Sequence, residues 1–555
     1  MKKLKENLKG LFKKRNIIDI VIILIFVSIV SIPLMSDKLN VYYDDGIQHI
    51  SRAFGTLESI KNGNFNIITG FTNNFGYSWN LFYGPLSTYG IIILQLIIKN
   101  FIVSYKIFLY ILLFLSGIFM YKFVYKMTNN RNIGLLASAI YVLAPYHLTD
   151  LYIRNALGEF ASFVFNPLVF LGLYNLFNTT ENNYYLGIGA IGLILTHNLS
   201  AIITALFAII YLIINIKELR KTKVIKDLII NIIFIIVITS FYWVPMLETK
   251  TISQYSVYQD GFMATPESTA SRGLGIRNLF VTLASDEFVF EIGPCLVLLA
   301  FSIMTLRRLE NNKKEYIIFL IFGFISLFMA IKYFPWKYLG KYFSIIQFPW
   351  RMLEFSNFFL SIVCSINAYI VIRKFNLKDV IIMILILIIY IMSLSPYLKY
   401  EENKIIDIEE INQGMVSGKH NEIIAGIAKG EYLPVNANNN RFYIATREDK
   451  VYVLSGKAII EDEIKTKNNL IFKLKNLEET IYEIPYVYYP GYKITADGIE
   501  IDSFETENGF LGFKMEEQTK ATIEITYEGT KIMKITSIIS LISLIAFGIY
   551  IWKKH

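Results

Sequence analysis

Long apolar runs separated by short polar segments recur along the whole chain. Many of them approach the roughly 20 residues that a helix needs to cross the hydrocarbon core of a bilayer. The pattern therefore predicts a polytopic α-helical membrane protein with about twelve transmembrane helices. The predicted spans are residues 17–34, 106–125, 133–145, 160–177, 184–196, 201–216, 228–247, 293–306, 316–331, 352–372, 380–394 and 535–552.

The apolar run at 87–98 is interpreted differently because it is too short to cross a bilayer. We predict that it lies in the membrane interface, within a large first outer loop at 36–105. Charge placement supports this choice, since nearly all of the short segments rich in Lys and Arg then lie on the cytoplasmic side, together with both termini. These segments are 1–15, 122–131, 217–226, 307–314, 373–378 and 553–554.

Beyond the run at 380–394 the apolar residues begin to alternate with polar ones. The stretch "TIYEIPYVYYPGYKITADGIEI" at 480–501 has this period of two and is interrupted by Pro-Gly and Asp-Gly turns. We therefore predict an extracytoplasmic β-rich domain at 396–533, between a transmembrane domain at 1–395 and a final helix with a basic tail at 534–555. Further predicted elements are strands at 441–446, 450–460, 469–475 and 521–527, and a polar turn at 436–440.

Composition agrees with a membrane location. The 555 residues are 54% apolar and 18% charged, with a mean hydropathy of +0.45, and a soluble chain of this length would need more polar surface. The net charge of +9 is divided among short cytoplasmic segments, which argues against nucleic-acid binding. Cys295 and Cys364 both fall in predicted spans and do not indicate a disulfide framework or a thiolate metal site. The basic N-terminus before a long apolar run predicts a retained anchor.

The stretch "YYDDGIQHISRAF" at 42–54 places several polar side chains next to the first span. If a helix begins here, Asp45, His49 and Arg52 share one face. Asp44 or Asp45 could then take a proton from a hydroxyl group or hold a divalent cation, and Arg52 could hold a phosphate. A salt-bridged helix start, with an aspartate as its cap, is the alternative.

Other polar residues fall in turns that the predicted topology places on the same outer side of the membrane. Ionisable groups near the membrane are costly and therefore mark candidate functional sites. Each also has a structural interpretation: Arg154 and Glu159 could pair, His197 could satisfy a turn, and Arg351 could snorkel from an aromatic belt. The candidates are Arg154, Glu159, His197, Asn198, Gln347, Trp350 and Arg351, and His147 and Asp150 lie in the same turn as Arg154.

Taken together, the basic N-terminus, the single span and the acidic pair in a large first outer loop resemble the GT-C superfamily of membrane glycosyltransferases. A finer resemblance is to bacterial YfhO-like proteins and to the membrane family named for a relation to 6-pyruvoyl-tetrahydropterin synthase, although the chain has no soluble pterin-site pattern. The matching pieces are "YDDGIQHISR" (43–52), "FYGPL" (82–86), "APYHLTDLYIRNALGEF" (144–160), "LTHNLSA" (195–201), "QFPWRMLEF" (347–355), "GEYLP" (430–434) and "YYPGYKITADG" (488–498).

The resemblance implies transfer of a sugar from a polyprenyl-phosphate donor to a polymer, lipid or protein acceptor of the bacterial cell envelope, at the outer face of the membrane. Asp44 or Asp45 would be the general base or a ligand of a divalent cation such as Mg or Mn, with no cofactor otherwise implied. We expect His49 to be a catalytic residue together with them. The residues expected to bind the donor phosphate or the substrate are Arg52, Arg154, Glu159, His197, Asn198, Gln347, Trp350 and Arg351. The alternatives are a transporter or flippase, and a non-catalytic protein that binds lipid-linked sugars.

Overall fold

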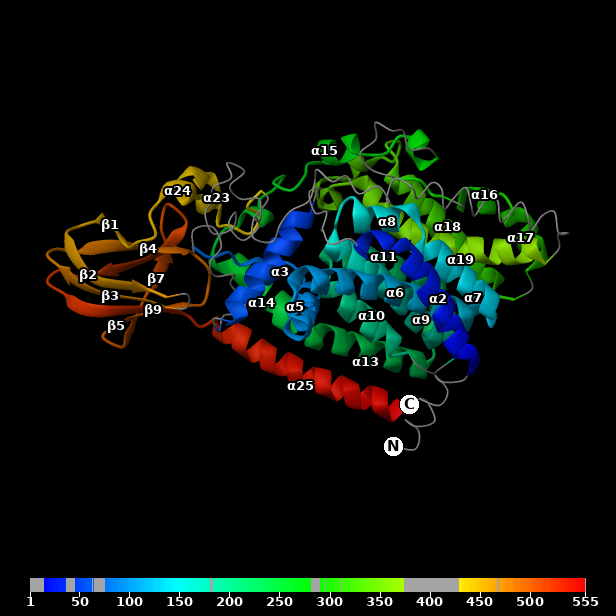
Figure 1. Cartoon of the computed structure of the whole chain (residues 1–555), viewed down its shortest axis with the longest axis horizontal. Coiled ribbons are helices and arrows are strands. Elements are labelled where there is room, and N and C mark those ends of the chain that lie inside the picture. The colour runs from blue at the N-terminus through cyan, green and yellow to red at the C-terminus, as the bar shows by residue number, and fades with distance from the viewer. Residues whose placement is uncertain are drawn as a thin grey trace.

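The computed structural model describes residues 14–35, 45–61, 63, 75–179, 183–280, 290–293, 295–309, 311–373, 429–466 and 469–554. A body of packed helices makes up most of the molecule, and the strands lie together at one end of it (Figure 1). The α-helices of this body are α2 (Lys14–Val30), α3 (Gly46–Lys61), α4 (Trp79–Phe82), α5 (Leu86–Ile98), α6 (Phe101–Thr128), α7 (Arg131–Val142), α8 (Pro145–Tyr152), α9 (Leu157–Asn178), α10 (Tyr185–Ile194), α11 (Asn198–Ile214), α12 (Ile216–Leu219), α13 (Thr222–Ile238), α14 (Ser240–Ile252), α15 (Pro266–Ser271), α16 (Cys295–Leu299), α17 (Ser302–Arg308), α18 (Lys313–Ala330) and α19 (Met352–Ile372).

Short 3₁₀ helices connect several of these elements. They are η1 (Ile32–Met35), η2 (Ser256–Tyr258), η3 (Ile276–Leu279), η4 (Trp336–Leu339), η5 (Lys341–Ile346) and η6 (Pro349–Arg351). The last of them, η6, leads directly into α19 and thereby fixes where the polar residues at the start of that helix lie.

Helices occupy each predicted span that falls on described residues, but they differ in length. Within the described part of the chain, four helical segments are long and apolar enough to cross a bilayer alone: Phe101–Thr128, Leu157–Asn178, Pro349–Ile372 and Lys531–Lys553. A fifth is formed if Thr222–Ile238 and Ser240–Ile252, which are bent by 60° at their junction, count as one broken span. The predicted span at 380–394 lies outside the described residues. The count of twelve therefore stays a prediction.

Helices α9 and α19 form the centre of the bundle. In their apolar windows 89% and 83% of the residues are buried, against 44% in α6 and 22% in α25, which therefore lie at the periphery. Aromatic rings fill the space between the central helices, as where Phe170 of α9 packs edge-on against Phe359 of α19 at 5.2 Å. The polar residues at the N-terminal ends of these two helices are consequently held inside the protein.

The C-terminal part is a β-sandwich, as the alternating pattern predicts. Its two antiparallel sheets have the orders β1-β4-β8-β7 and β2-β3-β9-β5-β6 within the described residues, and apolar side chains such as Phe472 and Phe513 fill the space between them. The elements are α23 (Val435–Asn439), α24 (Arg441–Thr446), β1 (Tyr452–Ser455), β2 (Ala458–Lys465), β3 (Asn469–Asn476), β4 (Thr480–Val487), β5 (Tyr492–Ala496), β6 (Ile499–Ile501), β7 (Ser503–Glu505), β8 (Phe510–Met515), β9 (Lys520–Tyr527) and α25 (Lys531–Lys554).

Two local predictions for this domain are wrong. Residues 436–439 and 441–446 belong to the helices α23 and α24, not to a turn and a strand, and only Asn440 between them keeps the predicted turn. The helix brings Tyr443 and Arg447, which are four residues apart, to the same side, where both contact the buried Glu483. The predicted strand at 450–460 is two strands in different sheets, because the chain turns at Gly456, whose φ is +91°.

The C-terminal domain packs on residues 75–83 and 255–258 of the helical body through aromatic residues and backbone hydrogen bonds. The Val487 N–H donates to the Phe75 carbonyl at 2.8 Å, and the Ser256 N–H donates to the Leu433 carbonyl at 3.0 Å. From the sandwich the chain returns as α25 along α13 and α14 (Figure 1), where Phe547 packs on Phe234 at 4.8 Å. The β-domain is thus attached to the helical body at more than one point.

Candidate functional site

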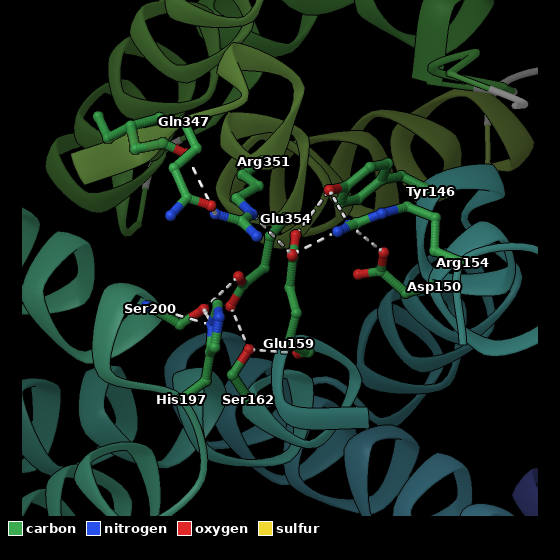
Figure 2. A network of polar contacts seen from close by, with 11 residues as sticks. Tyr146, Asp150, Arg154, Glu159, Ser162, His197, Ser200, Gln347, Arg351 and Glu354 are labelled. Atoms are coloured by element: carbon green, nitrogen blue, oxygen red, sulfur yellow. Dashed lines mark hydrogen bonds and ion pairs between the residues drawn. The ribbon is translucent and has the colours of Figure 1, made fainter. Parts of the chain in front are cut away.

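The guanidinium group of Arg154 is at the centre of a buried polar cluster (Figure 2). Its Nη1 atom donates to Asp150 Oδ1 at 2.7 Å, to Glu159 Oε2 at 3.0 Å and to the Tyr146 hydroxyl at 2.9 Å. Asp150 and Tyr146 lie on α8 and Glu159 lies in the first turn of α9, so the turn between these helices brings them together. Asn155 permits that turn by adopting a φ of +50°, which asparagine tolerates better than most residues. The predicted pairing of Arg154 with Glu159 is confirmed.

Arg351 brings a second guanidinium group to the same carboxylate from the start of α19. Its Nε lies 3.4 Å from Glu159 Oε2 without forming a hydrogen bond, while its Nη1 donates to Gln347 Oε1 at 3.0 Å. The Gln347 backbone has a φ of +61°, a rare conformation for this residue type, and it directs the chain into η6. Arg351 is 12% exposed whereas Arg154 is 1% exposed, so Arg351 is the more accessible cation.

A second carboxylate, that of Glu354, lies one helical turn after Arg351 and is buried. Ser162 and Asn166 of α9 donate to its Oε1 at 2.5 and 2.6 Å. Ser200 of α11 donates to its Oε2 at 2.6 Å, and the Ser200 hydroxyl lies 2.7 Å from His197 Nδ1. The side chains of α9, α11 and α19 therefore meet at this residue (Figure 2).

Asp45 lies directly before α3 and approaches the cluster from the start of that helix. Its backbone N–H donates to the Arg154 carbonyl at 3.1 Å, which fixes the start of α3 on the turn after α8. Among the described residues its carboxylate forms no hydrogen bond or ion pair. Burial raises the pKa of Asp45, while the charges of Arg154 and Arg351 oppose that rise. A carboxylate with an elevated pKa and no partner is suited to accept a proton. Asp44 lies outside the described residues.

The predicted helix start at 45–52 is confirmed, since α3 begins at Gly46. His49 and Arg52 both point into the protein and are buried. Burial lowers the pKa of His49 to about 3, with Arg52 and Arg154 adding to the effect, so the imidazole is neutral at physiological pH. Its ring packs edge-on against Tyr83 at 5.7 Å.

The arrangement of Arg52 favours an anchoring role over the predicted contact with a donor phosphate. Its Nε donates to Asn80 Oδ1 at 3.0 Å, and its Nη2 donates to the carbonyl groups of Tyr83 and Gly84 at 2.8 and 3.0 Å. The guanidinium group also lies over the Tyr83 ring, 4.9 Å from its centre. Arg52 therefore holds the loop that contains "FYGPL" in place.

Gly84 brings this loop into contact with the turn that carries His197. A Cβ atom at Gly84 would lie 2.6 Å from the carbonyl carbon and oxygen of Leu195, and the Leu86 N–H donates to that same oxygen at 2.8 Å. The motifs "FYGPL" and "LTHNLSA" are thus packed backbone against backbone. Tyr83 and His197 are brought close by this contact, with their ring centres 6.3 Å apart.

Replacing Gly84 with alanine is expected to destabilise the protein by about 1–3 kcal/mol, because the Leu195 backbone cannot move aside as a side chain could. The measurement is the apparent melting temperature of the purified protein in detergent. Gly548→Ala is the matched control, since a Cβ atom at Gly548 has no atom within 4 Å. Equal melting temperatures for the two variants would contradict the close approach.

His197 is neutral as well as buried. Burial lowers its pKa to about 3, although the charge of Glu159 opposes the shift. A neutral imidazole binds a ligand as a hydrogen-bond donor or acceptor, not as a cation. Asn198 is directed elsewhere, since its Nδ2 donates to the Tyr242 hydroxyl at 2.7 Å. Trp350 packs between Phe290 and Phe348, with ring centres at 5.4 and 4.6 Å.

The divalent cation stays a prediction that depends on Asp44. Among the described residues, no group of three or more His, Cys, Asp or Glu side chains is arranged to hold a metal ion. Asp45 instead has two guanidinium groups in its surroundings, and these already supply positive charge. Of the remaining early candidates, His147 is stacked on Phe163 with ring centres 3.9 Å apart and has a structural role in the core.

Several residues of the site were not among the candidates from the sequence. Glu354 had a detectable signal, since it is an acidic residue in the first turn of an apolar span, three residues after Arg351. Tyr146 and Ser200 carry no such signal, because hydroxyl groups are common in helices and turns. Their role depends on contacts between α8, α9, α11 and α19, which only the packed bundle defines.

The β-domain also contributes to the site through the segment at 429–434. Tyr432 stacks on Phe82 with ring centres 5.1 Å apart, and its N–H donates to the Tyr77 hydroxyl at 3.3 Å. The neighbouring Glu431 has its pKa raised to about 7, mainly by burial and further by the charge of Asp45. The motif "GEYLP" thus places a second carboxylate near the start of α3.

The comparisons with known proteins agree with the membrane assignment. The family model described as "6-pyruvoyl-tetrahydropterin synthase related domain; membrane protein" matches residues 81–400, which is more than half of the chain. An uncharacterized protein of Lactococcus lactis subsp. cremoris (strain MG1363) is 29% identical over 366 residues. That match covers 61% of this chain and 58% of the relative, so the chain spans less than two thirds of the relative's length.

Proposed function

The chain belongs to the 6-pyruvoyl-tetrahydropterin synthase related domain family of membrane proteins, and from this premise we propose that it is a membrane glycosyltransferase. It transfers a sugar from a polyprenyl-phosphate donor to a hydroxyl group of a cell-envelope acceptor. The reaction takes place at the outer face of a bacterial cell membrane, and both termini lie in the cytoplasm. The observation that carries the proposal is the partly buried Asp45 carboxylate, which has no partner among the described residues and lies in the field of Arg154 and Arg351.

In the proposed reaction Asp45 accepts the proton of the acceptor hydroxyl as its oxygen attacks the anomeric carbon. The bond from that carbon to the donor phosphate breaks, the configuration inverts, and the polyprenyl phosphate leaves with the bonding electron pair. Arg351 is suited to bind the phosphate, because its Nε forms no hydrogen bond in the described structure and its side chain is the more exposed of the two guanidinium groups. Positive charge next to a leaving phosphate stabilises the transition state.

Arg154 has a supporting role in this proposal. It donates hydrogen bonds to Asp150 and Glu159, so its positive charge holds these two carboxylates together in the cluster. Glu431 and Tyr432 come from the C-terminal domain and lie near Asp45 and Phe82, and in the proposal an acceptor from the cell envelope approaches from this side. This arrangement assigns donor binding to the helical body and acceptor orientation to the sandwich.

The compact form of the cluster favours an enzyme over a transporter. A transport path would need polar groups distributed through the membrane, often on discontinuous helices in paired repeats. The candidate residues instead lie at the N-terminal ends of α3, α9, α11 and α19 and in the turns that precede them.

The function is tested by comparing the cell-envelope polymers and glycolipids of cells with and without this chain by mass spectrometry. We expect one class of envelope molecule to lose a mass equal to a hexose or an N-acetylhexosamine, because that sugar is no longer transferred. Re-expression of the native chain is the control and restores the mass. Identical envelope spectra in all three strains would contradict the proposal, and accumulation of an unmodified sugar-lipid on the inner leaflet would support a flippase instead.

A further inference from the structure

The buried carboxylate of Glu354 has no role in the proposed transfer, yet three helices direct polar side chains at it. Thr204 donates to Asn166 Oδ1 at 2.6 Å, which turns the Asn166 amide nitrogen toward Glu354 Oε1. The hydroxyl of Ser200 meets Oε2 at 2.6 Å. Ser162 contacts Oε1 and also the Glu159 carbonyl, so its single proton is shared between two acceptors. Asn166 and Ser200 are therefore the donors that each give an unshared hydrogen bond to one oxygen of the Glu354 carboxylate.

The position of one proton follows from these contacts. Ser200 has a single hydroxyl proton and two neighbours that could accept it, Glu354 Oε2 at 2.6 Å and His197 Nδ1 at 2.7 Å. When Glu354 is ionised, its carboxylate accepts a stronger hydrogen bond than a neutral imidazole does, so the proton points to Glu354. The Ser200 oxygen must then accept a proton from Nδ1, because two acceptors cannot share so short a contact.

A competing arrangement exists through the backbone. The Ser200 N–H points at His197 Nδ1 from 3.4 Å and would be its donor if that nitrogen carried no proton. This contact is much longer than the one to the hydroxyl. The charge on Glu354 thus decides between the two arrangements. Nδ1 becomes a donor to the Ser200 oxygen only when the Ser200 hydroxyl donates its hydrogen bond to Glu354.

We propose that ionised Glu354 is a positioning residue that acts through Ser200 to hold His197 with its proton on Nδ1. The other ring nitrogen, Nε2, then has a free lone pair and forms no hydrogen bond with the described residues. Glu159, Arg351, Arg154 and His49 are the charged and titratable groups around the ring. His197 is therefore an acceptor for a ligand hydroxyl, and the ligand class that fits is a sugar. This last step, the sugar, rests on the proposed function, whereas the tautomer does not.

The tautomer can be read by nitrogen NMR of the full chain labelled with ¹⁵N-histidine, in lipid nanodiscs and without substrate. The chain has five histidines, and His197→Gln identifies the signal. At alkaline pH, where Glu354 is ionised, we expect the native protein to show a protonated Nδ1 and a bare Nε2, with the bare nitrogen strongly shifted downfield. All variants are compared with the native protein at this same pH. In Glu354→Gln the amide oxygen stays with Asn166 and the amide nitrogen donates to the Ser200 oxygen. The Ser200 hydroxyl then donates to Nδ1, His197 carries its proton on Nε2, and the two His197 signals exchange character.

Two further variants make the test decisive. Ser162→Ala removes a Glu354 contact that is not on the path to His197, and it should keep the native tautomer. Ser200→Ala leaves only the backbone N–H of residue 200 at Nδ1, and it should shift the proton to Nε2 even if Glu354→Gln does not fold. A native protein with the proton on Nε2, or unchanged signals in both Glu354→Gln and Ser200→Ala, would overturn the proposal. Because no sugar is present, these outcomes are independent of whether the chain proves to be a glycosyltransferase.

Discussion

Replacement of Asp45 with asparagine is expected to lower the rate of sugar transfer by about 10²–10⁴-fold, the range that removal of a general base typically gives. The amide cannot accept the proton of the acceptor hydroxyl, although it has nearly the size and shape of the carboxylate. The Asp45 side chain has no hydrogen bond to lose among the described residues, and its backbone contact with the Arg154 carbonyl does not depend on the side chain. The fold should therefore persist.

The measurement is glycosylation of the envelope acceptor in cells that express each variant at equal amounts, checked by the melting temperature of the purified protein. Asp44→Asn is tested separately, because the sequence motif does not distinguish the two acids. Asp260→Asn is the control, since that carboxylate is 82% exposed and pairs only with Lys341 on the surface. If Asp45→Asn and Asp44→Asn both transfer sugar at the native rate, the assignment of the base fails.

Replacement of Arg154 with methionine is expected to destabilise the protein by about 3–5 kcal/mol, the cost of removing one partner from a buried ion pair. Methionine fills most of the volume of the arginine side chain, but it leaves Asp150 and Glu159 next to each other without the cation that both contact. Both carboxylates are almost fully buried, so water cannot replace the lost interaction. Arg351 compensates only in part, because it contacts Glu159 and not Asp150.

The apparent melting temperature in detergent measures this effect. The double variant Asp150→Asn with Arg154→Met removes one charge of each sign and should recover a large part of the loss. Lys341→Met breaks an ion pair whose partners are 59% and 82% exposed, and it should cost no more than about 1 kcal/mol. A melting temperature of Arg154→Met close to that of Lys341→Met would show that the buried cluster does not stabilise the fold.

Local patterns predicted the helices and strands well where one pattern persists over many residues. The β-domain is an example, since β3 at Asn469–Asn476 and β9 at Lys520–Tyr527 match the predicted strands within one residue at each end. The prediction failed at 441–446, where six residues fit a strand or a short helix equally well. There the chain forms the helix α24, and Tyr443 within it and Arg447 directly after it both contact Glu483, a residue of a strand far along the chain.

For the candidate site, the sequence identified residues of the right kind but not all of their roles. Arg154, Glu159 and Arg351 do meet, and Asp45 approaches them. Arg52 looked equivalent to the other arginines in its type and position along the chain. Its contacts with the carbonyl groups of Tyr83 and Gly84 distinguish it, and no local pattern encodes those contacts.

The sequence by itself determined that this is a membrane protein of many apolar helices with a C-terminal β-domain, because hydropathy and period are local properties that each segment carries alone. It also determined that acids, imidazoles and arginines stand at the ends of those helices. Only the tertiary structure decided which of these groups meet in one polar cluster and which, like Arg52, hold a loop in place. It also decided that Ser200 lies next to His197 and links it to Glu354. The physical reason is that burial, charge and proton position depend on neighbours from distant helices, and these neighbours are defined only once the helices have packed.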